Sequence, residues 1–118
     1  MNTREIGNRY EDLACEYLEN EGLRIIERNY RCKIGEIDII ARDDSENCLV
    51  FAEVKYRKSS MQGGADFAVD YKKQNKIKKV AGVYLMHRKI ASSSFCRFDC
   101  VMITGSEVNY VKNAFGCL

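Results

Sequence analysis

Residues 35–55 read GEIDIIARDDSENCLVFAEVK, two mainly apolar runs on either side of a short polar tip at residues 43–47. This pattern is typical of a β-hairpin. If the strands pair symmetrically about the tip, Asp38 lies directly opposite Glu53, and Lys55 shares their face because side chains alternate along a strand. Carboxylates on opposed residues, whose Cβ atoms are roughly 4.5–5.5 Å apart, repel each other, so the pairing predicts a divalent cation between them.

The acid pair suits metal-assisted hydrolysis of a phosphate ester. The carboxylates of Asp38 and Glu53 and the carbonyl oxygen of Val54 are the hard oxygen ligands that Mg²⁺ or Mn²⁺ prefers. Lys55 would orient or help deprotonate a water molecule, or stabilise charge on the phosphate. An alternative interpretation pairs Glu36 with Lys55 across the hairpin and gives Asp38 a backbone hydrogen bond. It leaves the like charges of Asp38 and Glu53 opposed, whereas a shifted register would separate them.

The composition indicates one globular domain over residues 1–118. No apolar run approaches the ~18–20 residues that span a bilayer. The polar N-terminus lacks the apolar core of a signal peptide, so we expect a cytoplasmic protein. The six cysteines include no C-x-x-C pair, which favours reduced and mostly buried thiols.

The charges are distributed unevenly along the chain. Residues 1–21 carry six acidic and two basic side chains, whereas residues 48–118 carry twelve basic and five acidic ones. The basic excess gathers in residues 55–58 and 72–89, and a basic segment beside an acidic metal site suits a polyanionic substrate. The alternative is an ordinary solvated helix face, and composition alone favours neither.

Two amphipathic helices are predicted outside the hairpin. The first covers residues 3–21 and ends at Gly22 as a C-cap. Glu11 lies at the border of its apolar face, where it either points toward the hairpin or is an ordinary exposed helix acid. The second helix begins at residue 70 and ends near residue 88. Its predicted buried stripe consists of Ile77, Val80, Ala81, Tyr84 and Leu85.

The other segments predict strands and turns. The mixed pattern of residues 23–31 predicts a strand near the sheet edge, whereas the hairpin strands are apolar on both faces and are expected at the centre. Gly35 is expected to give the turn before the hairpin its backbone freedom. The polar loop expected at residues 56–65 is either a substrate contact or a simple connection. The remaining expectations are a helical turn at 66–69, strands at 97–104 and 108–111, and a short tail at 113–115.

An aspartate followed one strand later by Glu-x-Lys resembles the PD-(D/E)XK nuclease motif, here Asp38 with Glu53-Val54-Lys55. Ile37 stands where that motif usually has proline. The wider pattern resembles the YraN-like family over nearly the whole chain. This family is grouped by fold with restriction endonucleases and archaeal Holliday-junction resolvases. The matching segments are Gly7-x-x-x-Glu11, Arg28-Asn29-Tyr30-Arg31, Gly35-Glu36-Ile37-Asp38-Ile39-Ile40-Ala41, Phe51-x-Glu53-Val54-Lys55-x-Arg57, Asp70-x-x-Lys73, Ala81-x-x-Tyr84-Leu85, Arg97-Phe98-Asp99 and Asn113-Ala114-Phe115.

The resemblance implies a restriction-endonuclease-like α/β fold, with a central mixed sheet of about five strands flanked by helices. Asp38, Glu53 and Lys55 would be the catalytic residues. Glu11 matches a glutamate that adds to the metal site of resolvase relatives, so the expected ligand set is Asp38, Glu53, Glu11 and Val54. Asp99 lies in a matching segment, but we assign it nothing beyond a strand-end hydrogen bond. The expected nucleic-acid-binding residues are Arg57, Lys58, Lys73, Gln74 and Lys76.

The expected function is a Mg²⁺- or Mn²⁺-dependent endonuclease that hydrolyses phosphodiester bonds in DNA, including branched or damaged DNA. Resolvase relatives act as homodimers, so a homodimer is expected here as well. One alternative is a non-catalytic nucleic-acid-binding module that retains the nuclease fold. Another is an interaction protein whose basic helix binds an acidic partner.

Overall fold

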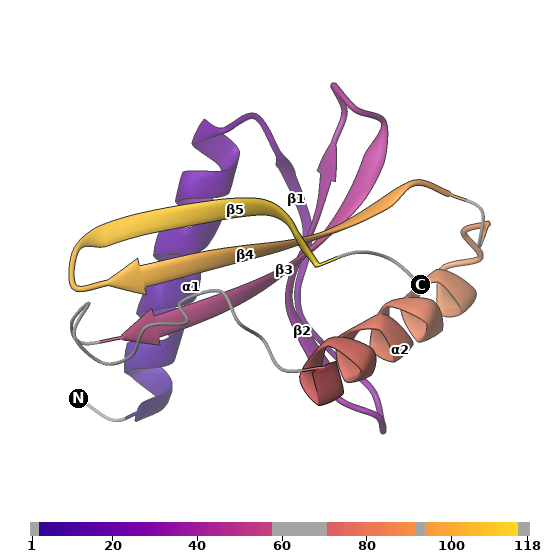
Figure 1. The fold of residues 1–118 in the computed structure, drawn as a ribbon, viewed down its shortest axis with the longest axis horizontal. Helices are drawn as coiled ribbons and strands as arrows, with labels where there is room; N and C mark the ends of the chain where they lie inside the picture. The colour runs from indigo at the N-terminus through magenta and orange to yellow at the C-terminus, as the bar shows by residue number, and fades with distance from the viewer. Residues whose placement is uncertain (1–2, 58–70, 92–93, 116–118) are drawn as a thin grey trace.

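A computed structural model of the chain describes residues 3–57, 71–91 and 94–115. These residues form five strands and two helices, which confirms the predicted α/β class (Figure 1). In these ranges, neither helix is long and apolar enough to cross a membrane. The elements are α1 (Thr3–Asn20), β1 (Arg24–Arg31), β2 (Glu36–Asp43), β3 (Cys48–Arg57), α2 (Tyr71–His87), β4 (Cys96–Thr104) and β5 (Glu107–Phe115).

The five strands form one mixed sheet in the order β1-β2-β3-β4-β5. The chain passes from β3 through α2 to β4, and these two strands pair in parallel. All other neighbours pair antiparallel. β1 is therefore an edge strand and β3 is central, as the sequence predicts.

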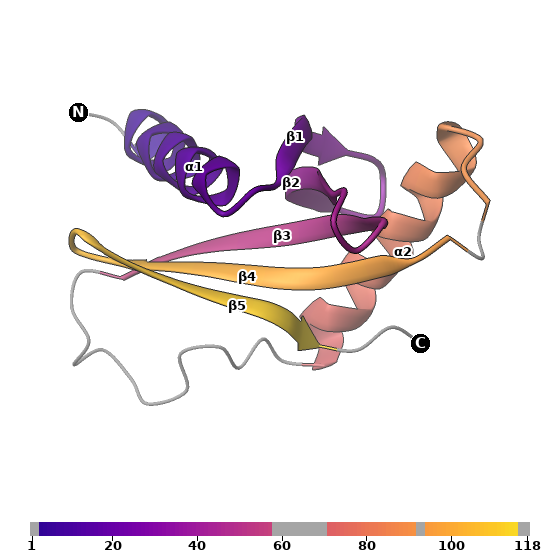
Figure 2. The ribbon, with the colours of Figure 1, turned by 90° about the horizontal axis from the view of Figure 1, so that it is seen from above.

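The two helices lie on opposite faces of the sheet and toward opposite ends of β3 (Figure 2). On one face, Ala14 and Leu18 of α1 pack against Ile39 and Val50. On the other face, Val80 of α2 belongs to a second core with other buried residues of the sheet and the helix. Because each helix buries a different face, the hairpin strands are apolar on both sides.

The sequence correctly identifies the end of α1. Gly22 has a φ of +95°, a left-handed conformation that costs little without a Cβ atom. The N–H of Leu23 donates to the carbonyl of Leu18 at 3.0 Å, and the N–H of Gly22 donates to Glu19 at 3.0 Å. These bonds satisfy carbonyl groups that would otherwise be left over at the helix end.

The role assigned to Gly35 was wrong, because only Gly22 and Gly105 have positive φ among the described glycines. Gly35 instead makes a close approach possible. A Cβ atom at this position would lie 3.1 Å from Cδ of Lys76 and 3.5 Å from Cγ2 of Val80. The missing side chain thus lets the aliphatic stem of Lys76 lie over the turn that leads into β2.

The expected short tail at residues 113–115 is in fact the end of β5. Phe115 is buried and stacks on Phe98 of β4, with ring centroids 5.1 Å apart. The sequence pattern did not reveal this end of β5, because the strand is irregular there. Its register against β4 shifts between Phe98 and Cys100, and Asn113 has a φ of +53°. The loop expected at 56–65 was wrong for Tyr56 and Arg57, which continue β3, and its remainder, the expected helical turn at 66–69 and the cap at residue 70 lie outside the described residues.

Candidate functional site

The hairpin has the predicted symmetric register. Its ladder runs from Asp43–Cys48 beside the tip to Ile39–Ala52. One position further, Oδ2 of Asp38 accepts a hydrogen bond from the backbone N–H of Val54 at 2.8 Å. The carboxylate of Asp38 therefore takes the place of a ladder carbonyl just beyond the last pair of the hairpin. The ribbon shows β2 and β3 diverging (Figure 1).

The neighbouring strand is irregular at the same level. Asn29 of β1 falls between the ladder pairs Arg28–Ile39 and Tyr30–Ile37, opposite Asp38, and its φ is +53°. The alternation of β2 changes here as well, because Ile39 packs in the core beneath α1 whereas Ile37 packs in the core beneath α2. The backbone around Asp38 thus departs from a regular strand on both sides.

Asp38 is largely buried among negative charges. Burial and the charge of Glu53 raise the pKa of Asp38 from 3.8 to about 7, and Glu11 and Glu36 contribute in the same direction. The hydrogen bond from Val54 acts against this rise without cancelling it. Asp38 and Glu53 are therefore close enough to repel each other, as the hairpin pairing predicts.

Glu53 is held by a lysine of α2. Nζ of Lys73 lies 3.0 Å from Oε1 of Glu53, whose side chain is only 12% exposed. Partial burial alone would lower the pKa of Lys73, but the hydrogen bond and charge of Glu53 outweigh it and raise the pKa. Lys73 thus supplies positive charge at the position where the sequence predicts a cation.

Lys55 lies two residues beyond Glu53 on the same face of β3, next to β4. Glu53 pairs with Cys100 and Lys55 pairs with Met102 in the parallel ladder. Burial raises the pKa of the Cys100 thiol to about 11, while the charge of Lys55 acts in the opposite direction. Lys55 is therefore close enough to affect groups beside the acid pair.

The alternative ion pair between Glu36 and Lys55 is replaced by another contact. Oε2 of Glu36 accepts a hydrogen bond from Nε of Arg31 at 2.9 Å, and both side chains are exposed. The backbone hydrogen bond that the same interpretation assigned to Asp38 is present.

Glu11 lies on α1, and its side chain is 15% exposed. Its Oε1 atom is 3.6 Å from Nη2 of Arg28, while Nη1 of that arginine lies 2.7 Å from Asp12. Among the described residues, Oε1 of Glu11 is buried and has no hydrogen-bond partner. This oxygen could therefore accept a hydrogen bond or bind a cation. Glu11 is near Asp38, because its charge helps to raise the pKa of Asp38.

The predicted ligand set is not assembled in the described part of the chain. No three His, Cys, Asp or Glu side chains there are grouped as they would be around a metal ion. The charges of Glu11 and Glu53 both act on Asp38, but the three carboxylates are not arranged as the ligands of one metal ion.

The expected nucleic-acid-binding residues are only partly gathered. Lys73 is at the acid pair, and Lys76 crosses the turn at Gly35. Gln74 is half-buried on α2, and Arg57 is half-buried at the end of β3. Lys58 lies outside the described residues.

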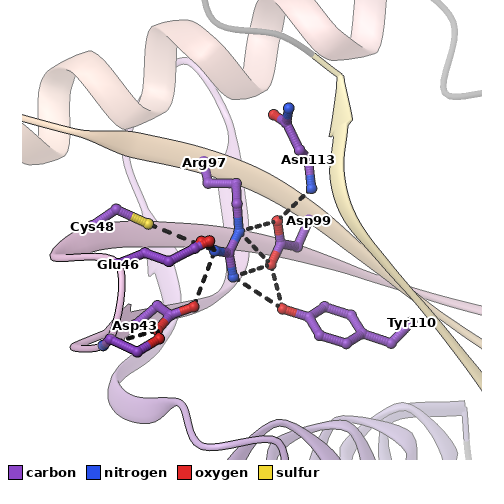
Figure 3. A network of polar contacts seen from close by, with 8 residues as sticks. Asp43, Glu46, Cys48, Arg97, Asp99, Tyr110 and Asn113 are labelled. Atoms are coloured by element: carbon purple, nitrogen blue, oxygen red, sulfur yellow. Dashed lines mark hydrogen bonds and ion pairs between the residues drawn. The ribbon is translucent and has the colours of Figure 1, made fainter.

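A buried ionic network is the main feature that the sequence analysis missed (Figure 3). Nε of Arg97 donates to Asp99 at 2.9 Å, and Nη1 of Arg97 donates to Asp43 and to Glu46 at 3.1 Å. The hydroxyl of Tyr110 also donates to Asp99. The hydrogen bond from Ser45 and the pairing with Arg97 lower the pKa of Asp43, although its burial opposes this.

The network gives Asp99 a larger role than a strand-end hydrogen bond. Asp99 is fully buried, and its Oδ1 accepts the backbone N–H of Asn113 at 2.8 Å, next to the irregular part of β5. Arg97 therefore connects the hairpin tip to β4, and Asp99 connects β4 to β5. The sequence does contain a signal for this network, namely Arg97 and Asp99 two positions apart in an otherwise apolar strand. Charged side chains in a buried strand require partners, so a network could have been expected there.

Comparison with known proteins identifies the family. Residues 10–103 match the model described as uncharacterised protein family UPF0102. A UPF0102 protein of Fusobacterium nucleatum is 48% identical over 113 residues, which cover 96% of this chain and 92% of the relative. A UPF0102 protein of Francisella tularensis is 42% identical over 119 residues, and the match covers 100% of both chains. The chain therefore belongs to the UPF0102 family, that of the YraN-like proteins.

Proposed function

We propose that this protein is a metal-dependent endonuclease with a restriction-endonuclease-like fold that hydrolyses phosphodiester bonds in DNA. The observation that carries the proposal is the position of Asp38. Its buried carboxylate lies between two diverging strands, next to Glu53, in surroundings that oppose its negative charge. A protein retains such unfavourable charge most readily where it binds a cation or a reacting group.

The donor set fits a hard divalent cation in its chemistry. Asp38, Glu53 and the carbonyl oxygen of Val54 would be the ligands, and Glu11 would supply the buried oxygen that lacks a hydrogen-bond partner among the described residues. Binding requires Lys73 to release Glu53. When bound, Mg²⁺ or Mn²⁺ would activate water and stabilise the charge of the phosphoryl transition state.

The cationic side chains would hold the substrate. Lys55 is on the same face of β3 as Glu53, where it can contact a non-bridging phosphate oxygen. Lys73, Lys76, Arg57 and Lys58, the last of which lies outside the described residues, would bind flanking phosphates, which makes DNA binding salt-dependent, and Gln74 would add a neutral hydrogen bond. A homodimer would extend this surface along branched or damaged DNA.

The test is cleavage of duplex, single-stranded, flap and junction DNA with Mg²⁺ or Mn²⁺. We expect metal-dependent cleavage that is lost in Asp38→Ala and Glu53→Ala. Glu36→Ala is the matched control, because Glu36 is an exposed acid of the same hairpin that pairs with Arg31. Absence of cleavage on all four substrates, together with absence of calorimetric Mn²⁺ binding by the wild type, would contradict the proposal.

A second candidate function is nucleic-acid binding without cleavage. The ion pair between Lys73 and Glu53 favours it, because a lysine ammonium replaces the cation that hydrolysis needs. This function predicts salt-sensitive DNA binding without cleavage, weakened by neutralising Lys73 and Lys76. Cleavage that depends on Asp38 would exclude it.

A further inference from the structure

An aromatic pair flanks the candidate site. The rings of Tyr10 and Tyr56 are stacked, with centroids 3.8 Å apart and an angle of 18° between their planes. Tyr10 directly precedes Glu11 on α1, and Tyr56 directly follows Lys55 on β3. The stack therefore joins the two elements that carry these candidate site residues.

Tyr56 remains accessible although Tyr10 covers one face of its ring. The residue is 40% exposed, so its accessible area lies on the other face and the ring edges. Within the described residues, the β2–β3 ladder stops at Ile39–Ala52, four positions before Tyr56. The ring thus lies along a part of β3 that β2 does not cover.

The stack has cationic neighbours. The charge of Arg9 acts on the Tyr10 hydroxyl, and Arg57 follows Tyr56 in the chain. An exposed aromatic ring with an arginine acting on its partner, near the proposed phosphodiester site, combines the two features that bind single-stranded nucleic acid, which are base stacking and attraction of the backbone.

We propose that Tyr56, backed by Tyr10 on the α1 face of β3, is a stacking platform for an unpaired nucleobase of a strand that passes the edge of β3 left open by β2, where its phosphate is held by Asp38 and, from the α2 face, by Lys55. The inference rests on the proposed function and assigns its substrate class, which is DNA with an unpaired nucleotide at the cleavage position. In an intact duplex, neighbouring base pairs cover both faces of each base, so the platform discriminates against it. Stacking requires only the flat face of a base and therefore tolerates any sequence.

The chain contains no tryptophan, which makes a direct test possible. Tyr56→Trp introduces a single tryptophan at the platform, whose fluorescence is excited selectively over that of the tyrosines. Phe95→Trp is the matched control, because Phe95 is also exposed, at 73%, but contacts Leu49 near the start of β3. Each variant is titrated with single-stranded oligo(dT), with a duplex of equal length, and with an abasic oligonucleotide, in EDTA so that cleavage cannot occur.

We expect oligo(dT) to quench the fluorescence of Tyr56→Trp much more strongly than the duplex or the abasic strand, and to leave Phe95→Trp unchanged. Tyr56→Ala should lower the affinity for oligo(dT) roughly 5- to 150-fold, the loss expected for one base–aromatic stack, whereas Tyr56→Phe retains it. Equal quenching by the abasic strand, or wild-type affinity in a folded Tyr56→Ala variant, would overturn the inference. If Tyr56→Ala does not fold, the Tyr56→Trp titrations decide.

These outcomes separate the platform from the nuclease. Base-dependent quenching in a protein that cleaves nothing supports the platform and contradicts the enzymatic function. Cleavage that depends on Asp38 but proceeds equally on intact duplex and in Tyr56→Phe and Tyr56→Ala supports the enzyme and overturns the platform.

Discussion

Replacing Asp38 with asparagine should stabilise the protein at alkaline pH. In the folded chain the pKa of Asp38 is about 7, against an ordinary value of 3.8. The folded state therefore binds the proton more tightly than the unfolded state, and stability falls as pH rises between these two values. Each pKa unit corresponds to about 1.4 kcal/mol, so ionised Asp38 costs about 4 kcal/mol above pH 8.

The substitution removes this cost and retains the shape of the side chain. The amide oxygen that Asp38→Asn introduces can still accept the Val54 N–H, but the new NH₂ group adds donors that cost about 1–3 kcal/mol if unpaired. This second cost does not vary with pH. We therefore compare how much more stable the variant is than the wild type at pH 8 and at pH 5. The pKa values of Asp38 in the folded and unfolded chain predict that this advantage grows by about 2.5 kcal/mol between the two pH values.

The assay is urea unfolding followed by circular dichroism at several pH values, in EDTA. Glu36→Gln is the control, since Glu36 is exposed on the same strand and is the smallest of the contributors to the raised pKa of Asp38, so its stability difference should follow this pH dependence only weakly. If the difference between Asp38→Asn and wild type is the same at pH 5 and pH 8, Asp38 ionises without penalty and the reasoning about the site is refuted.

Three further substitutions test the fold. Asp99→Ala removes one of the two buried carboxylates that pair with Arg97, leaving Asp43, and should cost about 3 kcal/mol in urea unfolding; an unchanged midpoint would show that the Asp99 contacts contribute nothing. Gly22→Ala should cost about 1–2 kcal/mol because its φ is +95°, and equal thermal stability would contradict this strain. Phe115→Ala should cost about 3–5 kcal/mol by removing a buried ring from Phe98, whereas a true tail would tolerate it.

The hairpin and its acid pair could be predicted because the information is local. The tip is short, and both strands are apolar on both faces, so one symmetric register satisfies the pattern. That register brings Asp38 and Glu53 near each other, but the ladder ends at Ile39–Ala52 and the alternation of β2 changes at Asp38, so their predicted direct pairing does not belong to the ladder. The stripe of α2 was also predictable, because Ile77 and Val80 recur with helical spacing and are buried.

The remaining features depend on contacts between distant segments. The divergence of β2 from β3 at Asp38 coincides with an irregularity at Asn29 of β1, and asparagine adopts positive φ more readily than most residues, but its presence alone does not predict where neighbouring strands separate. The extension of β5 to Phe115 depends on its contact with Phe98 across a shifted register. Lys73 was expected to bind phosphate, but its pairing with Glu53 depends on where α2 crosses the sheet.

The Arg97 network has a consequence for folding kinetics. It joins Arg97 to Asp43 across 54 positions of sequence and to Glu46 across 51, whereas the β2–β3 hairpin joins near neighbours. Local pairings close early, and parallel strands linked through a helix close late. Interactions that form after the rate-limiting step slow unfolding without accelerating folding. Truncating Arg97 should therefore shift the unfolding arm of a chevron plot and leave its folding arm nearly unchanged, so the network sets the lifetime of the folded chain.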